Sequence, residues 1–112
     1  MARAATTADA FNAMAEPRRR QIVEVLGGRE LSVSEIVAAV TIPQPQVSKH
    51  LRVLREVGLV EARDQGRQRL YRLNGEPLKP IHDWVSEFEA MWNERLDRLD
   101  DYLEEVQAKE KP

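Results

Sequence analysis

Apolar residues recur at steps of three and four in two neighbouring stretches near the middle of the chain, which is the spacing of one helix face. They are Val33, Ile36, Val37 and Val40 in the first stretch, and Val47, Leu51, Leu54 and Val57 in the second. Pro43 disfavours a helical conformation at the residue before it, so a tight turn is predicted between the two helices. Ser32 and Glu35 have the spacing of a capping box at the start of the first helix, and Gly58 ends the second.

After Gly58 the period of the pattern changes from helical to two, which indicates β-strands. Short strands are predicted over residues 59–63 and 69–73, with residues 64–68 between them. Gly66 in the connecting segment can adopt the positive φ that hairpin tips need. Helix, turn, helix and hairpin in this order indicate a winged helix-turn-helix, a module that places its second helix in the DNA major groove.

The outer side of the second predicted helix carries amide, hydroxyl and cationic side chains. Such groups can bond to base edges or phosphates, although a polar helix face is most often simply solvated. Here the face follows a tight turn and precedes a hairpin rich in arginine, which favours DNA binding. The candidate DNA-contacting residues are Gln44, Gln46, Ser48, Lys49, His50, Arg52, Arg67 and Arg69. Gln46, Ser48 and His50 are expected to contribute to base choice, and the cations to contact phosphates.

Three segments form an ordered set at residues 13–23, 44–60 and 66–73. They read Ala-Met-Ala-Glu-Pro-Arg-Arg-Arg-Gln-Ile-Val, Gln-Pro-Gln-Val-Ser-Lys-His-Leu-Arg-Val-Leu-Arg-Glu-Val-Gly-Leu-Val and Gly-Arg-Gln-Arg-Leu-Tyr-Arg-Leu. Together they resemble the ArsR/SmtB family of bacterial repressors, over roughly residues 8–75. The resemblance implies a mainly α fold with a small β-hairpin, a winged helix-turn-helix with N- and C-terminal dimerisation helices. It also implies a homodimer that occupies an inverted-repeat operator in double-stranded DNA until a signal arrives.

The metal-sensing residues of that family are not matched here. The resemblance places cysteines on the first helix of the pair, where this chain has Ser32 and Ser34, and the whole chain contains no cysteine. Thiolate binding of soft metals or arsenicals is therefore excluded, as is disulfide-based redox sensing. A second type of site, on the C-terminal helix, would have His82 beside Asp83 as its one candidate histidine. Neither a metal nor a cofactor is expected, and the effector is unknown.

A second apolar stripe runs from Ile81 to Val106 at helical spacing and predicts a single long helix. The stripe exceeds what a small winged domain can cover, so it favours a dimer interface with the N-terminal helix as its partner. The candidate interface residues are Phe11, Met14, Trp84, Phe88, Trp92 and Leu96. Two alternatives remain open: the helix closes the monomer's own core, or its aromatic side chains line a small-molecule pocket.

The 112 residues are expected to form one domain. It divides into an N-terminal dimer helix (1–16), a DNA-binding core (17–75), a C-terminal dimer helix (76–108) and a frayed tail (109–112). The net charge of −2 is uneven, with +4 over residues 1–75 and −6 over residues 76–112, so the acidic end is expected to face away from DNA. No apolar stretch approaches a membrane span and the start has no signal-peptide core, so a soluble cytoplasmic protein is expected.

The sequence contains no catalytic constellation: it has no phosphate-cradling glycine loop, no nucleophile elbow and no cysteine for thiol chemistry. Two kinds of function remain, a DNA-binding transcriptional repressor of its own or neighbouring genes and a winged-helix module used only for protein association. An association module has no need of exposed groups such as Gln46, Lys49 and Arg67. The sequence therefore favours the repressor.

Overall fold

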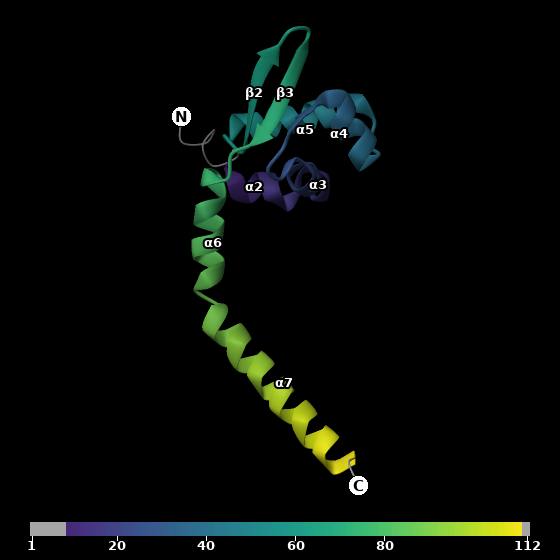
Figure 1. Ribbon diagram of the computed structural model, residues 1–112. Coiled ribbons are helices and arrows are strands. Elements are labelled where there is room, and N and C mark those ends of the chain that lie inside the picture. The colour runs from purple at the N-terminus through teal and green to yellow at the C-terminus, as the bar shows by residue number, and fades with distance from the viewer. Residues whose placement is uncertain (1–8, 111–112) are drawn as a thin grey trace. The chain divides into compact units, whose positions relative to one another are not determined.

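The computed structural model of the protein describes residues 9–110, and most of its elements are labelled in Figure 1. The chain forms two compact units, the first ending at Ile81 and the second beginning at His82. The first unit contains α2 (Ala10–Ala15), α3 (Pro17–Leu26), β1 (Glu30–Ser32), α4 (Val33–Val40), α5 (Gln44–Glu56), β2 (Val60–Gln65), β3 (Gln68–Leu73) and a 3₁₀ turn (Glu76–Leu78). Helix α6 (Lys79–Ser86) crosses the boundary, and α7 (Glu89–Glu110) belongs to the second unit. The fold is mainly α with a small antiparallel sheet, as the sequence predicted.

The helix pair α4 and α5 begins and ends where the sequence indicated. The Ser32 hydroxyl accepts a hydrogen bond from the Glu35 backbone N–H at 3.3 Å, and the Glu35 carboxylate accepts one from the Ser32 N–H at 2.9 Å. These bonds lower the pKa of the Glu35 carboxyl. Thr41 ends α4 in the left-handed conformation at φ 56°, and Pro45 lies in the first turn of α5, where its missing N–H costs nothing. The predicted capping box and turn are confirmed.

The hairpin is longer and tighter than the sequence indicated. The strands β2 and β3 pair from Val60 opposite Leu73 to Gln65 opposite Gln68, so Gly66 and Arg67 alone form the tip, with Gly66 at φ 63°. The predicted five-residue connection is therefore wrong, because backbone pairing continues through its polar residues. A third strand, β1, pairs with β3 and gives the order β1-β3-β2. This third strand was not predicted from the sequence.

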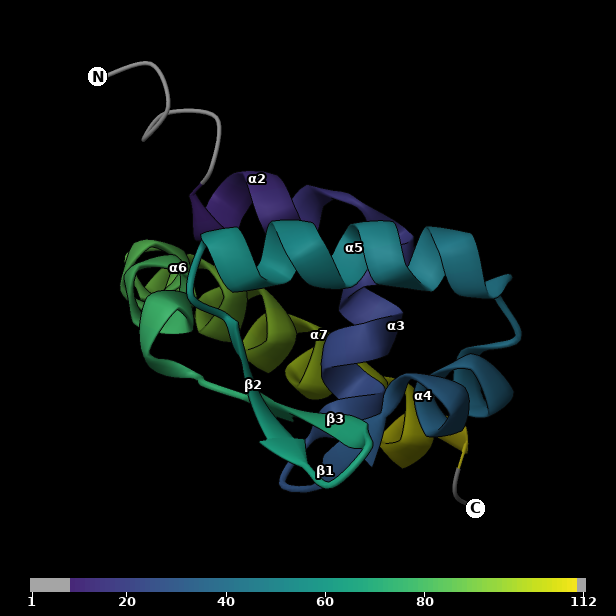
Figure 2. The ribbon, with the colours of Figure 1, turned by 90° about the horizontal axis from the view of Figure 1, so that it is seen from above.

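The core of the first unit lies between α3, α4, α5 and the sheet. Figure 2 shows α5 lying across α3. The side chains that are fully buried there are Ile22, Leu26, Ile36, Val47, Leu51, Leu54 and Leu59. Full burial of such a side chain contributes about 1.5–3 kcal/mol relative to leaving it exposed. Because three of these residues belong to α5, the core fixes which face of that helix points outward.

The predicted single C-terminal helix is wrong, since the chain forms α6 and α7 with a break at Glu87 and Phe88. At the break, the Glu87 N–H donates to the Trp84 carbonyl and the Phe88 N–H to the Val85 carbonyl, three residues back. Such bonds tighten the last turn of a helix. Helix α7 continues to Glu110, two residues past the expected end. In the described part of the chain, none of the helices has the length and apolarity to cross a lipid bilayer.

The expected N-terminal dimer helix over residues 1–16 is described only in part. Residues 1–8 lie outside the described residues, as do residues 111 and 112 of the expected tail. Within the described range, α2 occupies Ala10–Ala15 and is capped by the Asp9 carboxylate, which accepts from the Asn12 N–H at 2.7 Å. Glu16 adopts an extended conformation between α2 and Pro17, which starts α3. A proline at the next position disfavours a helical conformation at Glu16, so the two helices are separate.

Candidate nucleic-acid interface

The outward face of α5 is formed by the residues that the core leaves exposed. Val47, Leu51 and Leu54 are buried, and this inner row turns the opposite side of the helix to solvent. The exposed positions among the candidate residues of this helix are Gln44, Gln46, Ser48, Lys49 and Arg52. Amide, hydroxyl and cationic groups are thus presented together on one rigid element that follows a tight turn.

His50 has a different environment from its neighbours on α5. Its ring is partly buried, and Nδ1 has no hydrogen-bond partner among residues 9–110. Burial lowers the pKa of His50, and the nearby positive charge of Arg19 lowers it further. Charges at Glu16 and Arg18 also act on the ring, so His50 lies beside the start of α3. This side chain was expected to contribute to base choice, but it is half-buried, unlike the exposed candidate residues on α5.

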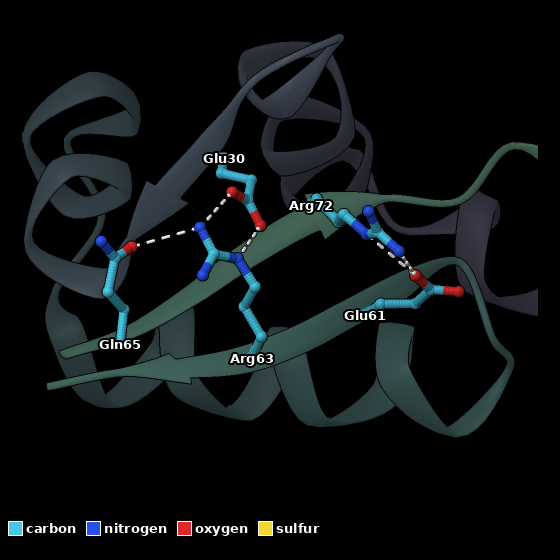
Figure 3. A network of polar contacts seen from close by, with 5 residues as sticks. All are labelled: Glu30, Glu61, Arg63, Gln65 and Arg72. Carbon is cyan, nitrogen blue, oxygen red and sulfur yellow. Dashed lines mark hydrogen bonds and ion pairs between the residues drawn. The ribbon is translucent and has the colours of Figure 1, made fainter.

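The β2–β3 hairpin is the wing of the fold. Two of its arginines form ion pairs with carboxylates on the outer face of the sheet, as Figure 3 shows. Arg63 on β2 donates to both carboxylate oxygens of Glu30 on β1, at 2.7 and 2.8 Å, and to the Gln65 side chain at 3.2 Å. The bidentate pair lowers the pKa of Glu30 and raises that of Arg63. Arg72 on β3 pairs with Glu61 on β2 at 2.8 Å.

The remaining wing arginines differ from one another. Arg69 pairs with Asp64 across the hairpin at 3.1 Å. Arg67 is exposed at the tip and makes no ion pair or hydrogen bond with the described residues. Of the four arginines on the β2–β3 hairpin, three have an acidic partner, whereas Arg67 has none among residues 9–110. The sequence could not separate them, because the pairs depend on strand register.

Arg18 is the first of three consecutive arginines, and it was not among the candidate residues predicted from the sequence. Arg19 donates to the carbonyls of Ala13 at 2.7 Å and Asn12 at 3.1 Å, and Arg20 donates to the carbonyl of Met14 at 2.6 Å. Both side chains therefore satisfy the C-terminal end of α2. The Arg18 side chain is exposed and makes no such bond within residues 9–110. The three consecutive arginines could have indicated a DNA contact here, but only their hydrogen bonds show which of them is unpaired.

The candidate dimer residues carry apolar surface in both units. In the first unit, the Phe11 side chain is 43% exposed and Met14 packs partly against the core. In the second unit, Trp84, Phe88, Trp92 and Leu96 are exposed, with Trp92 at 47% and Leu96 at 57%. Trp84 and Phe88 meet edge to face, with ring centroids 5.2 Å apart. Two of these aromatic rings, four residues apart, are therefore in contact beside the break before α7.

The serines and the histidine considered for metal binding lie in separate environments. Ser32 is the N-cap of α4, and Ser34 is exposed in the first turn of that helix. His82 Nδ1 lies 3.3 Å from an oxygen of Asp83. Within the described range, no group of three or more histidine, aspartate or glutamate side chains is arranged to hold a metal ion.

Comparisons with known proteins agree with this geometry. Residues 16–62 match the family model described as "Bacterial regulatory protein, arsR family". The chain is 42% identical over 71 residues to the HTH-type transcriptional repressor SmtB of Mycobacterium tuberculosis, a match that covers 63% of this chain and 53% of SmtB. It is 33% identical over 87 residues to the transcriptional regulator Rv2034 of the same organism, a match that covers 78% of each protein.

A solved structure extends the similarity along most of the chain. An ArsR-like transcriptional regulator from Rhodococcus sp. RHA1 superposes with a TM-score of 0.65 at 27% identity and covers 91% of this chain and 96% of that protein. The match to SmtB spans about half of that repressor's length. The relatives are transcriptional regulators and not enzymes, as the sequence predicted. The helix-turn-helix, the wing and these matches together establish that the chain belongs to the ArsR family of bacterial regulatory proteins.

Proposed function

We propose that this protein is a dimeric, sequence-specific DNA-binding repressor that acts in the cytoplasm on its own or neighbouring genes. The observation that carries the proposal is the outer face of α5, where polar and cationic side chains lie opposite a buried apolar row. A helix is about 10–12 Å across with its side chains, which fits a major groove about 12 Å wide. The name of the related SmtB as a transcriptional repressor supports the same function.

The exposed residues divide into two roles in this proposal. Gln46 and Ser48 contact base edges, because an amide can bond bidentately to adenine and a hydroxyl can bond to any base. Lys49, Arg52 and the wing-tip residue Arg67 contact phosphates or the groove edge, which sets affinity more than sequence preference. Gln44, exposed at the start of α5, extends this face.

Arg69 and His50 are assigned lesser roles than the sequence analysis gave them. Arg69 is a secondary contact, since Asp64 already neutralises part of its charge. His50 supports the position of α5 against the start of α3 and is no longer proposed to read bases, because its ring is partly buried. A His50→Gln variant should therefore keep the sequence preference of the wild type.

In vitro selection from a random duplex library with the full-length protein tests the DNA-binding function. The proposal expects enrichment of an inverted repeat with half-sites about one helical turn apart. Gln46→Ala should then cost about 1–3 kcal/mol on the selected site and little on a scrambled duplex. Gln107→Ala, which removes an exposed amide from α7, is the matched control and should bind as the wild type does. A library without enrichment would favour the alternative, a winged-helix module used only for protein association.

The dimer is proposed from the exposed apolar side chains of α6 and α7, together with Phe11 and Met14. Exposed large apolar side chains gathered along a helix mark an interaction site, and aromatic residues are enriched in such interfaces. The Trp92→Glu variant should give monomers or unfolded chain in sedimentation, because an unpaired carboxylate would be buried on each side of the interface. Glu105→Gln, an exposed polar change on the same helix, should leave the dimer intact. A wild-type monomer at micromolar concentration would refute this assembly.

A further inference from the structure

Six of the eleven arginine and lysine side chains within residues 9–78 are already engaged by acceptors within the protein. Arg19, Arg20 and Arg29 donate to backbone carbonyls, and the wing arginines other than Arg67 pair with carboxylates. Within residues 9–78, the arginine and lysine side chains left without an acceptor are Arg18, Lys49, Arg52, Arg55 and Arg67. Three of these lie on α5 and one at the wing tip. Arg18 is the member of this set that belongs to neither element.

The start of α3, which carries Arg18, and the hairpin, which carries Arg67, lie on different sides of α5. Figure 2 shows α5 with α2 and the start of α3 on one side and the β2–β3 hairpin on the other. Arg18 lies in the first turn of α3, and its positive charge is one of those that lower the pKa of His50 on α5. The first turn of α3, which carries Arg18, and the tip of the hairpin, which carries Arg67, therefore lie on opposite sides of α5.

A helix in the major groove has a phosphate strand along each of its flanks, because helix and groove have nearly the same width. The wing can reach one of these strands. We propose that Arg18 contacts a phosphate of the other strand, so that α5 is held between two cationic contacts, Arg18 and Arg67. This inference rests on the DNA-binding function proposed above and adds a contact outside the helix-turn-helix and wing.

The neighbours of Arg18 favour this role. Arg19 and Arg20 tie the first turn of α3 to the end of α2, which fixes the backbone from which Arg18 projects. The Glu16 carboxylate accepts from the Arg18 backbone N–H at 3.2 Å and caps the helix. Glu16 is thus the one acidic residue beside three consecutive arginines, so the local net charge is positive. The lowered pKa of His50 keeps that ring neutral near pH 7, so its own charge neither adds to nor competes with this contact.

Salt-dependent binding of the full-length protein to a mixed-sequence duplex of about 30 base pairs, roughly three helical turns, tests the proposal. The variants are Arg18→Gln, Arg18→Lys, Arg67→Ala and the matched control Arg29→Gln, whose guanidinium is engaged by the Val25 carbonyl at 2.8 Å. Arg18→Gln should reduce the slope of log affinity against log salt by about 0.9 for each bound protomer, as should Arg67→Ala. Arg18→Lys and Arg29→Gln should keep the wild-type slope, and all four variants should unfold at nearly the wild-type temperature.

Two outcomes overturn the proposal in different ways. An Arg18→Gln slope equal to that of the wild type, with a reduced slope for Arg67→Ala, would refute the Arg18 contact and leave the DNA-binding function standing. A wild-type protein that binds no duplex at low salt would refute both. An Arg18→Lys slope as low as that of Arg18→Gln would also refute the contact, because the lysine retains the charge that releases counterions.

Discussion

The wing offers a direct test of which arginines are available to DNA, through the comparison of Arg67→Ala with Arg63→Ala. The two residues lie on the same hairpin and carry the same charge, but their environments differ. Arg67 has no acidic partner among the described residues, whereas Arg63 is held by both oxygens of Glu30. Removal of Arg67 should therefore take away a DNA contact, and removal of Arg63 should take away an internal ion pair.

The size of the difference follows from counterion release. Loss of one phosphate contact changes the log–log salt slope by about 0.9, so the affinity deficit of Arg67→Ala grows about eightfold for each tenfold decrease in salt. Arg63→Ala should leave the slope close to that of the wild type, because its charge is already balanced by Glu30. Its stability should change little, since exposed ion pairs contribute little to folding.

Fluorescence anisotropy with a labelled duplex over a series of salt concentrations measures both slopes. Thermal unfolding of each variant provides the control for folding. A slope for Arg63→Ala that falls as far as that for Arg67→Ala would refute the reasoning, because it would mean that the Glu30 pair opens to let Arg63 reach DNA.

Three further predictions concern helix capping, the pH dependence of stability and the response to metals. Ser32→Ala removes the hydroxyl that caps α4 and should cost about 1 kcal/mol in urea unfolding; an unchanged midpoint would contradict the role of the capping box. Because burial and then Arg19 lower the pKa of His50 from its ordinary value of 6.5, the unfolded chain binds the proton more tightly, and stability should fall as the pH drops below 6.5. The His50→Gln variant should lose this component, and an identical pH dependence in both proteins would disprove it. Zinc and arsenite should leave DNA binding unchanged; release of DNA by submicromolar zinc, abolished in His82→Ala, would reveal a metal site on the C-terminal helices.

Local signals in the sequence predicted the helix-turn-helix well. The capping box at Ser32 and Glu35, the break at Pro43 and the positive φ at Gly66 each depend on a few adjacent residues, and all are present in the structure. The missed strand β1 is three residues long and exists because it pairs with β3, about 40 residues away in sequence. The break at Glu87 and Phe88 contains neither proline nor glycine, so the sequence had no helix-breaking residue from which to predict it.

The sequence predicted which residue types form the candidate site, but not which of these side chains are exposed and unpaired. Helical spacing correctly placed Gln46, Lys49 and Arg52 on the exposed face of α5. It did not predict that His50 is half-buried, since this position lies at the edge of the buried row, where helical spacing alone does not decide exposure. The pairing of Glu30 with Arg63 joins residues 33 positions apart across three strands. Only the register of the sheet could identify it.

DNA is proposed to lie against α5 and the wing tip. Backbone amide shifts of the isotope-labelled full-length protein, titrated with its selected duplex, report which residues the duplex contacts. The largest shifts should occur at Gln46, Lys49, Arg67 and Arg18, with small shifts on the outer sheet face around Glu30. Shifts confined to that outer face or to α7, with α5 unchanged, would refute this placement of the DNA.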